Sequence, residues 1–200
     1  MTTVLTKRFT ITEYDHLAEL GFFSEDDRVE LIRGEIIPMV SKGKPHSVCE
    51  TLLLREFIKL LQDRALVRGQ EPVTISDYSE PEPDITIVRN VDDNYLSAHP
   101  SSADILLLIE IADSSLKYDQ EVKLPLYTEA KISDYWIFNL VENHLECYSE
   151  PLHDFQGKFG YRKKVIYLSN ELVNIPCFPD LIVDLSKVFP QKIQYKPRLR

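Results

Sequence analysis

The sequence predicts a mixed α/β protein in which helices pack on a central β-sheet. Residues 105–112 (ILLLIEIA) form an almost continuous apolar run, which is typical of a strand that is buried on both faces. Residues 47–63 carry apolar side chains at helical spacing. A second helical segment, 123–132, lies between the apolar runs 105–112 and 134–141, and this strand–helix–strand order indicates a right-handed crossover between parallel strands.

The N-terminal part predicts a helix followed by a hairpin. Residues 11–23 (ITEYDHLAELGFF) are typical of a short amphipathic helix, with Thr12 as the N-cap and Gly21 as the stop signal. Residues 28–40 (RVELIRGEIIPMV) then indicate two strands that fold back on each other about Arg33-Gly34.

The remaining segments predict further strands. We expect a strand near residues 65–75, a turn over YSEPEPD, the strand ITIV at 85–88 and a polar loop at 91–102. The C-terminal quarter indicates antiparallel strands and a terminal apolar segment, in the runs HLECYSEP, FGYRKKVIYLS and ELVNIPCFPDLIVDL. We interpret residues 1–200 as a single domain, with a core at about 26–150 and a C-terminal extension at about 151–200.

Composition restricts the classes of protein. With 200 residues, 44% of them hydrophobic, the chain is long enough for one domain with a substantial core. The three cysteines include no CxxC pair, which disfavours a disulfide framework and structural zinc and favours a cytoplasmic protein. We expect no membrane helix and no secretory signal. The net charge of −9 argues against coating nucleic acid by bulk electrostatics, but not against meeting phosphates through a metal and a few local cations.

Two acidic residues stand at unusual places in the predicted sheet. Glu110 lies inside the most apolar strand, where an ionised carboxylate costs several kcal/mol, roughly, without compensation. Asp84 follows Pro83 at the threshold of the neighbouring apolar strand. If the two strands pair, both carboxylates reach one edge of the sheet, where Mg²⁺ would find the oxygen ligands it prefers. An ordinary ion pair, or a glutamate facing water at a frayed strand end, explains Glu110 equally well.

The chain resembles a known family on several ordered motifs. Its marks are RVELIRGEII, the histidine of GKPHSV, EPEPDITIV and IEIADSSLKYDQEVKLPLYTEAKISDYWIFN, spread over roughly residues 9–148. Together they resemble the Uma-type restriction endonucleases of bacteria, a branch of the PD-(D/E)XK nuclease superfamily. The strict superfamily pattern has a lysine two residues after the glutamate of the strand, and this chain has Ala112 at that position. In the Uma-type branch the lysine lies instead on the helix that follows the strand. The resemblance implies a restriction-endonuclease-like core with an N-terminal helix and hairpin and extra C-terminal strands.

The same resemblance implies the residues of a site. Asp84, Glu110 and, through its main chain, Ile111 correspond to metal ligands for Mg²⁺ or Mn²⁺, and Lys123 corresponds to the migrated lysine. Glu30 matches an early acidic position that binds a second metal or orients water. The accessory positions are His46, which equally well makes a hydrogen bond at a helix start, and Ser115, which we interpret as shaping a loop together with Ser114 and Asp119.

One residue departs from the expected pattern. Pro125 follows Lys123 by two residues, and proline is tolerated in the first turn of a helix but breaks its interior. We therefore expect the helix to start near Lys123 rather than near Asp119. Tyr127, one turn further on, is expected in the core.

Three functions compete at this point. The leading hypothesis is a Mg²⁺-dependent endonuclease that hydrolyses phosphodiester bonds in DNA, with the metal activating water and the lysine assisting. The second is a catalytically silent nuclease fold that acts as a binding or regulatory module. The third and weakest is a glycoside hydrolase that uses Asp84 and Glu110 as acid and base. Cleavage of both DNA strands commonly uses a homodimer, in which residues 172–188 could pack between protomers or equally complete the monomer's own sheet.

Overall fold

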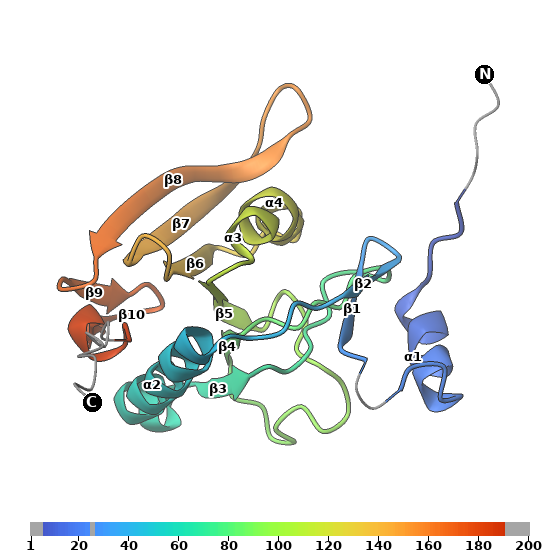
Figure 1. Cartoon of the computed structure of the whole chain (residues 1–200), viewed down its shortest axis with the longest axis horizontal. Helices are drawn as coiled ribbons and strands as arrows, with labels where there is room; N and C mark the ends of the chain where they lie inside the picture. Colours follow the sequence, from blue (N-terminus) through green and yellow to red (C-terminus); the bar gives the residue numbers. More distant parts are fainter. Residues whose placement is uncertain (1–5, 25–26, 191–200) are drawn as a thin grey trace, which may run out of the picture.

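The structure, a computed structural model, describes residues 6–24 and 27–190 and is built on a six-stranded sheet (Figure 1). The strand order is β3-β4-β5-β6-β7-β8, and only the neighbours β5 and β6 run parallel. This confirms the predicted mixed sheet, including the parallel pair on either side of a helical crossover. The strands are β3 (Leu66–Gly69), β4 (Ile85–Val88), β5 (Ile105–Ala112), β6 (Asp134–Asn139), β7 (His144–His153) and β8 (Phe159–Leu168).

Helices cover the two faces of this sheet. Helix α2 (Lys44–Leu61) packs on one face, and the helical segment made of α3 (Leu116–Tyr118), a π-turn η2 (Asp119–Lys123) and α4 (Leu124–Glu129) packs on the other (Figure 1). The remaining elements are α1 (Ile11–Glu19), β1 (Val29–Ile32), β2 (Glu35–Pro38), η1 (Gln62–Arg64), β9 (Leu172–Ile175), β10 (Phe178–Asp184) and η3 (Leu185–Lys187).

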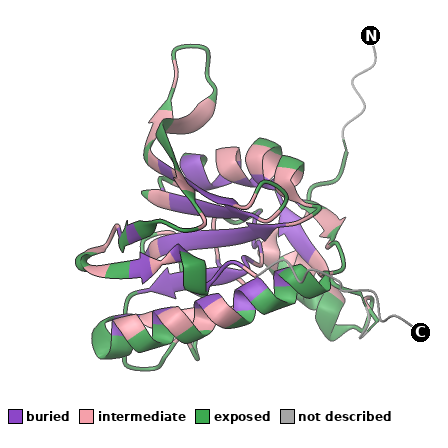
Figure 2. Cartoon of the chain, turned by 60° about the vertical axis from the view of Figure 1, so that its left-hand side comes forward, coloured by how far each residue is buried: buried purple, intermediate pink, exposed green. Residues whose placement is uncertain are grey.

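Alternation along β5 divides the interior into two cores. Leu107, Ile109 and Ile111 join the core beneath α2, whereas Leu108 and Ala112 join the core beneath α4. Successive side chains of a strand point to opposite faces, so a strand buried on both faces reads as a continuous apolar run. Glu110 therefore points toward the side of the sheet that carries α4. Figure 2 shows these central strands as buried while α2 keeps an exposed outer face.

The N-terminal prediction is confirmed except for its cap. Helix α1 begins at Ile11 because Thr10, not Thr12, is the N-cap: the Thr10 hydroxyl accepts from the Glu13 amide, and the Glu13 carboxylate accepts from the Thr10 amide. This capping box satisfies two amides that the helix leaves free. The β1–β2 hairpin turns at Arg33 and Gly34, which adopt φ of 50° and 77°, the left-handed conformation of a tight hairpin turn.

The α-helix α4 begins at Leu124, close to the start expected from Pro125, but other helical turns precede it. Helical turns run from Leu116 to Glu129, and the stretch Asp119–Lys123 is a π-helix in which the Leu124 amide donates to the carbonyl of Asp119, five residues back. Pro125 has no amide hydrogen and its ring would crowd a regular α-helix. The wider π-turn just before it lets the chain continue, so Lys123 lies within the helical segment rather than at its beginning.

The C-terminal strands pack on the chain's own core. β9 and β10 form a separate antiparallel hairpin whose Val173, Ile175 and Val183 lie in the core beneath α2. The expected strand near 65–75 is shorter than predicted, because only Leu66–Gly69 pairs with β4 before the chain turns away. Within the described residues, no helix combines the length and apolar character needed to cross a membrane.

Candidate active site

Asp84 and Glu110 meet where β4 and β5 pair. Ile85 pairs with Ile109, so one residue further along the ladder Asp84 lies beside Glu110, and the Asp84 amide donates to Glu110 Oε2 at 3.4 Å. Both carboxylates line a cavity of about 220 Å³ between the hairpin, the start of α2 and the helical segment. The β4–β5 register, which hydrophobic patterning favours, is thus what brings these two acids together.

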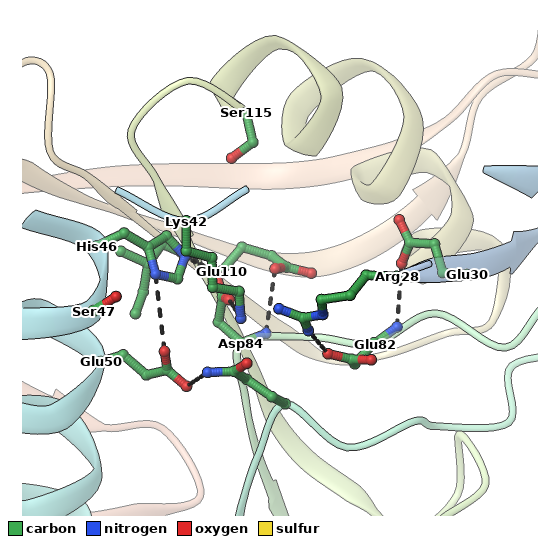
Figure 3. A network of polar contacts seen from close by, with 12 residues as sticks. Arg28, Glu30, Lys42, His46, Ser47, Glu50, Glu82, Asp84, Glu110 and Ser115 are labelled. Atoms are coloured by element: carbon green, nitrogen blue, oxygen red, sulfur yellow. Dashed lines mark hydrogen bonds and ion pairs between the residues drawn. The ribbon is translucent and has the colours of Figure 1, made fainter. Parts of the chain in front are cut away.

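Asp84 is buried and receives hydrogen bonds on both oxygens. Lys42 Nζ lies 2.9 Å from its Oδ1, while His46 Nε2 at 3.0 Å and the Ile111 amide at 2.8 Å contact its Oδ2 (Figure 3). Burial raises the pKa of Asp84, but the hydrogen bonds and charges of His46 and Lys42 outweigh it and bring the pKa to about 2. Asp84 is therefore a carboxylate throughout the neutral range.

Glu110 is held from the helical side of the sheet. Its Oε1 accepts hydrogen bonds from Lys123 Nζ and from the Tyr127 hydroxyl, each at 2.9 Å. Burial raises the pKa of Glu110 well above its ordinary value, and Lys123 counteracts this. Burial would lower the pKa of Lys123, but the charges of Glu110 and Glu30 reverse this and raise it, so Lys123 carries its proton.

Glu30 joins the same cluster from β1. Its Oε2 lies 3.5 Å from Lys123 Nζ and accepts the Glu82 amide at 3.2 Å, and its Oε1 accepts the Tyr118 hydroxyl at 3.0 Å. Lys123 thus bridges the carboxylates of Glu30 and Glu110, which are 80 residues apart in the sequence (110 − 30 = 80). The hairpin, the central strand and the helical segment all contribute charge to one wall of the cavity.

His46 approaches Asp84 from the first turns of α2. One turn later on the same face, Glu50 Oε2 lies 3.9 Å from His46 Nδ1, and Glu50 Oε1 accepts a hydrogen bond from Gln70 (Figure 3). His46, Glu50 and Asp84 are all buried, and each offers one ligand atom within 4.8 Å of the others. Among the described residues, these three form a group of three histidine or acidic side chains that lie close enough together to share a metal ion.

Ser115 supports the loop before the helical segment. Its hydroxyl donates to Asp119 Oδ2 at 2.7 Å, which agrees with a loop-shaping interaction. Asp119 is buried, and burial raises its pKa to about 6 although Lys123 and the Ser115 hydroxyl oppose the shift. Asp119 therefore holds its proton to a higher pH than an ordinary aspartate does.

The structure brings most of the predicted positions together. The cavity is lined by residues that include Glu30, His46, Asp84, Glu110, Ser115 and Lys123. Ile111 is the exception: its amide binds Asp84, and it is not part of the described cavity wall.

Sequence reasoning missed three of the contacts. Glu50 follows His46 by four residues on a predicted helix, and this spacing could have found it. Lys42 meets Asp84 across 42 residues of chain (84 − 42 = 42), a contact for which the sequence carries no local signal. Tyr127 is fully buried as expected, but its hydroxyl also binds Glu110.

The donor set suits a hard divalent cation. Asp84 and Glu110 supply carboxylate oxygens to one cavity, and such oxygens are the ligands of Mg²⁺ and Mn²⁺. Two ammonium groups, Lys42 and Lys123, lie 2.9 Å from these carboxylates and balance their charge in this structure.

Comparison with known proteins identifies a family and a shared fold. The family Uma2, described as "Putative restriction endonuclease", matches residues 11–186. A solved structure from Anabaena variabilis, described as "a putative nuclease belonging to DUF820", aligns over 90% of this chain and 97% of its own with a TM-score of 0.69 at 16% identity, and therefore shares the fold. The type IIG restriction endonuclease BpuSI aligns over 57% of this chain and 12% of its own, at 17% identity and a TM-score of 0.35. No curated protein matches the chain.

Proposed function

The chain belongs to the Uma2 family, and we propose that it is a divalent-metal-dependent endonuclease that hydrolyses phosphodiester bonds in DNA. The observation that carries the proposal is the position of Lys123, whose buried ammonium lies between Glu110 and Glu30 on the wall of the cavity that Asp84 also lines. A protonated lysine beside a pair of carboxylates provides both charges that phosphodiester hydrolysis needs.

Asp84 and Glu110 are the proposed ligands of Mg²⁺ or Mn²⁺, and the main chain of Ile111 is the third proposed ligand. When bound, the metal lowers the pKa of a water and neutralises charge on the phosphoryl oxygens. Asp84 is preorganised for this role, because the Ile111 amide and His46 fix one of its oxygens while Lys42 lies against the other. A ligand that is already oriented loses little conformational freedom on binding.

Lys123 is the proposed electrostatic group. Its pKa is raised, so it remains an ammonium in the neutral range and can stabilise negative charge that develops on the phosphoryl group. Glu30 holds this ammonium from the side opposite Glu110, and Tyr118 holds Glu30. We therefore assign Glu30 to positioning, with orientation of the attacking water as its further proposed role.

DNA would reach the cavity past the start of α2. Lys42 and Gly43 line the cavity, and the first amides of a helix, which lack intrahelical acceptors, favour anions such as phosphate. Lys44 adds an exposed cation at this end of the helix. The net charge of −9 restricts phosphate attraction to such local features, and because few phosphates are contacted we expect the affinity for DNA to fall only gradually with added salt.

Plasmid cleavage tests the proposal. Purified protein is incubated with supercoiled plasmid and Mg²⁺ or Mn²⁺, beside Asp84→Asn, Lys123→Met and the control Lys117→Met. Lys117 lies six residues before Lys123 on the same helical segment but is exposed and paired only at 3.8 Å with Glu121. We expect Lys117→Met to cleave like the wild type and the other two variants to lose about 100-fold or more of the rate. Cleavage that persists in EDTA, or in Lys123→Met, would contradict the assignment.

One observation favours a silent fold as the second candidate. Each carboxylate already has an ammonium partner, Lys42 for Asp84 and Lys123 for Glu110, so the cluster is charge-compensated without a metal. A binding or regulatory module needs no more than this. Calorimetric binding of Mg²⁺ or Mn²⁺ that is lost in Asp84→Asn, combined with no cleavage of any nucleic acid, would select this candidate.

Double-strand cleavage would require two such sites. A homodimer supplies them, although residues 172–188 contribute to the monomer's own core through Val173, Val183 and Val188. The plasmid products distinguish the cases: a monomer with one site releases nicked circles first, whereas a two-site dimer linearises the plasmid directly. Light scattering on the same sample gives the mass in solution.

A further inference from the structure

His46 and Glu50 leave two polar atoms facing each other without a bridge. Both side chains are more than nine-tenths buried, and they lie four residues apart on one face of α2. The distance from His46 Nδ1 to Glu50 Oε2 is 3.9 Å, which is too long for a hydrogen bond. Among the described residues, His46 Nδ1 is a buried polar atom that has no hydrogen-bond partner.

The surroundings of Asp84 determine which nitrogen of His46 carries the proton. Asp84 accepts from the Ile111 amide and from the Lys42 ammonium, so it acts as an ionised carboxylate with acceptors only. His46 Nε2, 3.0 Å from Asp84 Oδ2, must then be the donor. A metal ion at Nδ1 would take the place of any proton there, and Glu50 Oε2 is the carboxylate oxygen that faces this nitrogen.

We propose that His46 Nδ1 and Glu50 Oε2 bind a second cation, of the transition-metal class represented by Zn²⁺ and Co²⁺, which is separate from the cation proposed between Asp84 and Glu110. Two ligand atoms of a tetrahedral zinc ion at about 2.0–2.2 Å lie about 3.3–3.6 Å apart, so His46 and Glu50, at 3.9 Å, need to close by only a few tenths of an ångström to share an ion. Water completes the coordination, since the protein supplies two ligands.

The contacts around the pair match those of known metal-binding histidines. A histidine that binds a metal through one nitrogen usually donates its other N–H to a carboxylate, which fixes the ring and increases its basicity. Asp84 is that carboxylate here, and Gln70 fixes the other oxygen of Glu50. The positive end of the α2 dipole opposes a cation at this place, and the charges of Glu50 and Asp84 offset it.

The ligand types decide which metal is preferred. An imidazole nitrogen with a carboxylate oxygen selects Zn²⁺ or Co²⁺ over Mg²⁺, whereas a pair of carboxylates suits Mg²⁺ or Mn²⁺. The two sites are therefore chemically distinct although Asp84 touches both. Because the new site is built from His46 and Glu50, it stands on its own geometry and does not depend on DNA cleavage.

Metal binding measured without substrate tests this inference. Co²⁺ is titrated into the wild type, Glu50→Gln, Glu110→Gln and the control Glu56→Gln, and followed by visible absorption and calorimetry. Glu56 lies on the same helix but outside the cluster, so its variant should bind as the wild type does. We expect Glu50→Gln to lose one bound Co²⁺ equivalent that Glu110→Gln retains. A ¹⁵N spectrum of the histidines should show Zn²⁺ shifting Nδ1 of His46 in the wild type but not in Glu50→Gln.

Two results would overturn the inference. If Glu50→Gln binds Co²⁺ with wild-type stoichiometry and affinity, Glu50 is no ligand. Alternatively, the ¹⁵N spectrum would show protons on both nitrogens of His46 in the presence of excess Zn²⁺, which makes the pair an ion pair. Failure of plasmid cleavage leaves both readouts unchanged, so the endonuclease proposal and the second cation site are tested separately.

Discussion

Replacing Lys123 by methionine removes the buried cation while keeping a side chain of similar length. Lys123 is 4% exposed, and its ammonium lies 2.9 Å from Glu110 and 3.5 Å from Glu30. Removing one partner of a buried ion pair typically costs about 3–5 kcal/mol. We expect the lower end, because Glu110 keeps the Tyr127 hydroxyl and its raised pKa lets it take up a proton. For a protein of this length, about 3 kcal/mol corresponds to a fall in Tm of about 6–12 °C.

A double-mutant cycle isolates the interaction between Lys123 and Glu110. The four proteins are the wild type, Lys123→Met, Glu110→Gln and the double variant, each unfolded in urea and followed by circular dichroism. Contacting charged residues usually couple by about 0.5–3 kcal/mol, so the double variant should lose less than the sum of the single variants by about that amount. The exposed pair Lys117 and Glu121 is the matched control and should couple by less than about 0.5 kcal/mol. Additive losses at Lys123 and Glu110 would refute the interpretation that burial makes this pair strong.

Two further predictions concern other parts of the fold. Burial raises the pKa of Glu146, but hydrogen bonds from Tyr148, Lys164, His144 and Gln120 outweigh it and bring the pKa from 4.5 to about 2. The folded pKa lies below the unfolded one, so this carboxylate stabilises the fold above pH 4.5 and loses that contribution as pH falls toward 2. The stability of Glu146→Gln, measured by circular dichroism during acid unfolding, should therefore fall less steeply with decreasing pH than that of the wild type. An equal dependence of stability on pH would contradict the prediction. Pro125→Ala permits a regular α-helix, which should turn Lys123 away from Glu110, slow plasmid cleavage by about tenfold or more and lower Tm, because the buried ion pair is broken. Equal cleavage rates would show that the π-turn does not position the lysine.

The elements predicted from sequence are those whose signal is local. The apolar run of β5, the helical spacing of α2 and the turn at Arg33-Gly34 are set by side-chain periodicity and backbone conformation within a few residues. The π-turn was missed because the effect of Pro125 depends on whether packing holds the helix together around it. The helical segment buries apolar side chains in the core beneath α4, and this packing favours a continuous helix. The intrinsic helix preference of the residues around Pro125 does not favour one.

The residues of the candidate site likewise divide into those that the local sequence reveals and those that only the tertiary fold brings to the site. Asp84 and Glu110 were singled out because a carboxylate in an apolar strand is costly, and this is visible in the sequence. Lys42 was not singled out as their partner, because the loop before α2 reaches Asp84 only through the tertiary fold. The family resemblance supplied Lys123, for which residue chemistry alone left an exposed helix-start lysine as an alternative; its burial is a tertiary property.

The location of the lysine follows from the packing of Ala112. Ala112 is fully buried on the same face of β5 as Glu110 and lies in the core beneath α4, so a lysine there would overpack the site by about 1–3 kcal/mol. The helix that packs over this small residue instead brings Lys123 to Glu110. In a Lys123→Ala background the space is vacated, and adding Ala112→Lys should restore part of the plasmid cleavage that Lys123→Ala loses. If the double variant folds, by circular dichroism, yet cleaves no faster than Lys123→Ala, then the direction from which the ammonium arrives matters as much as its charge.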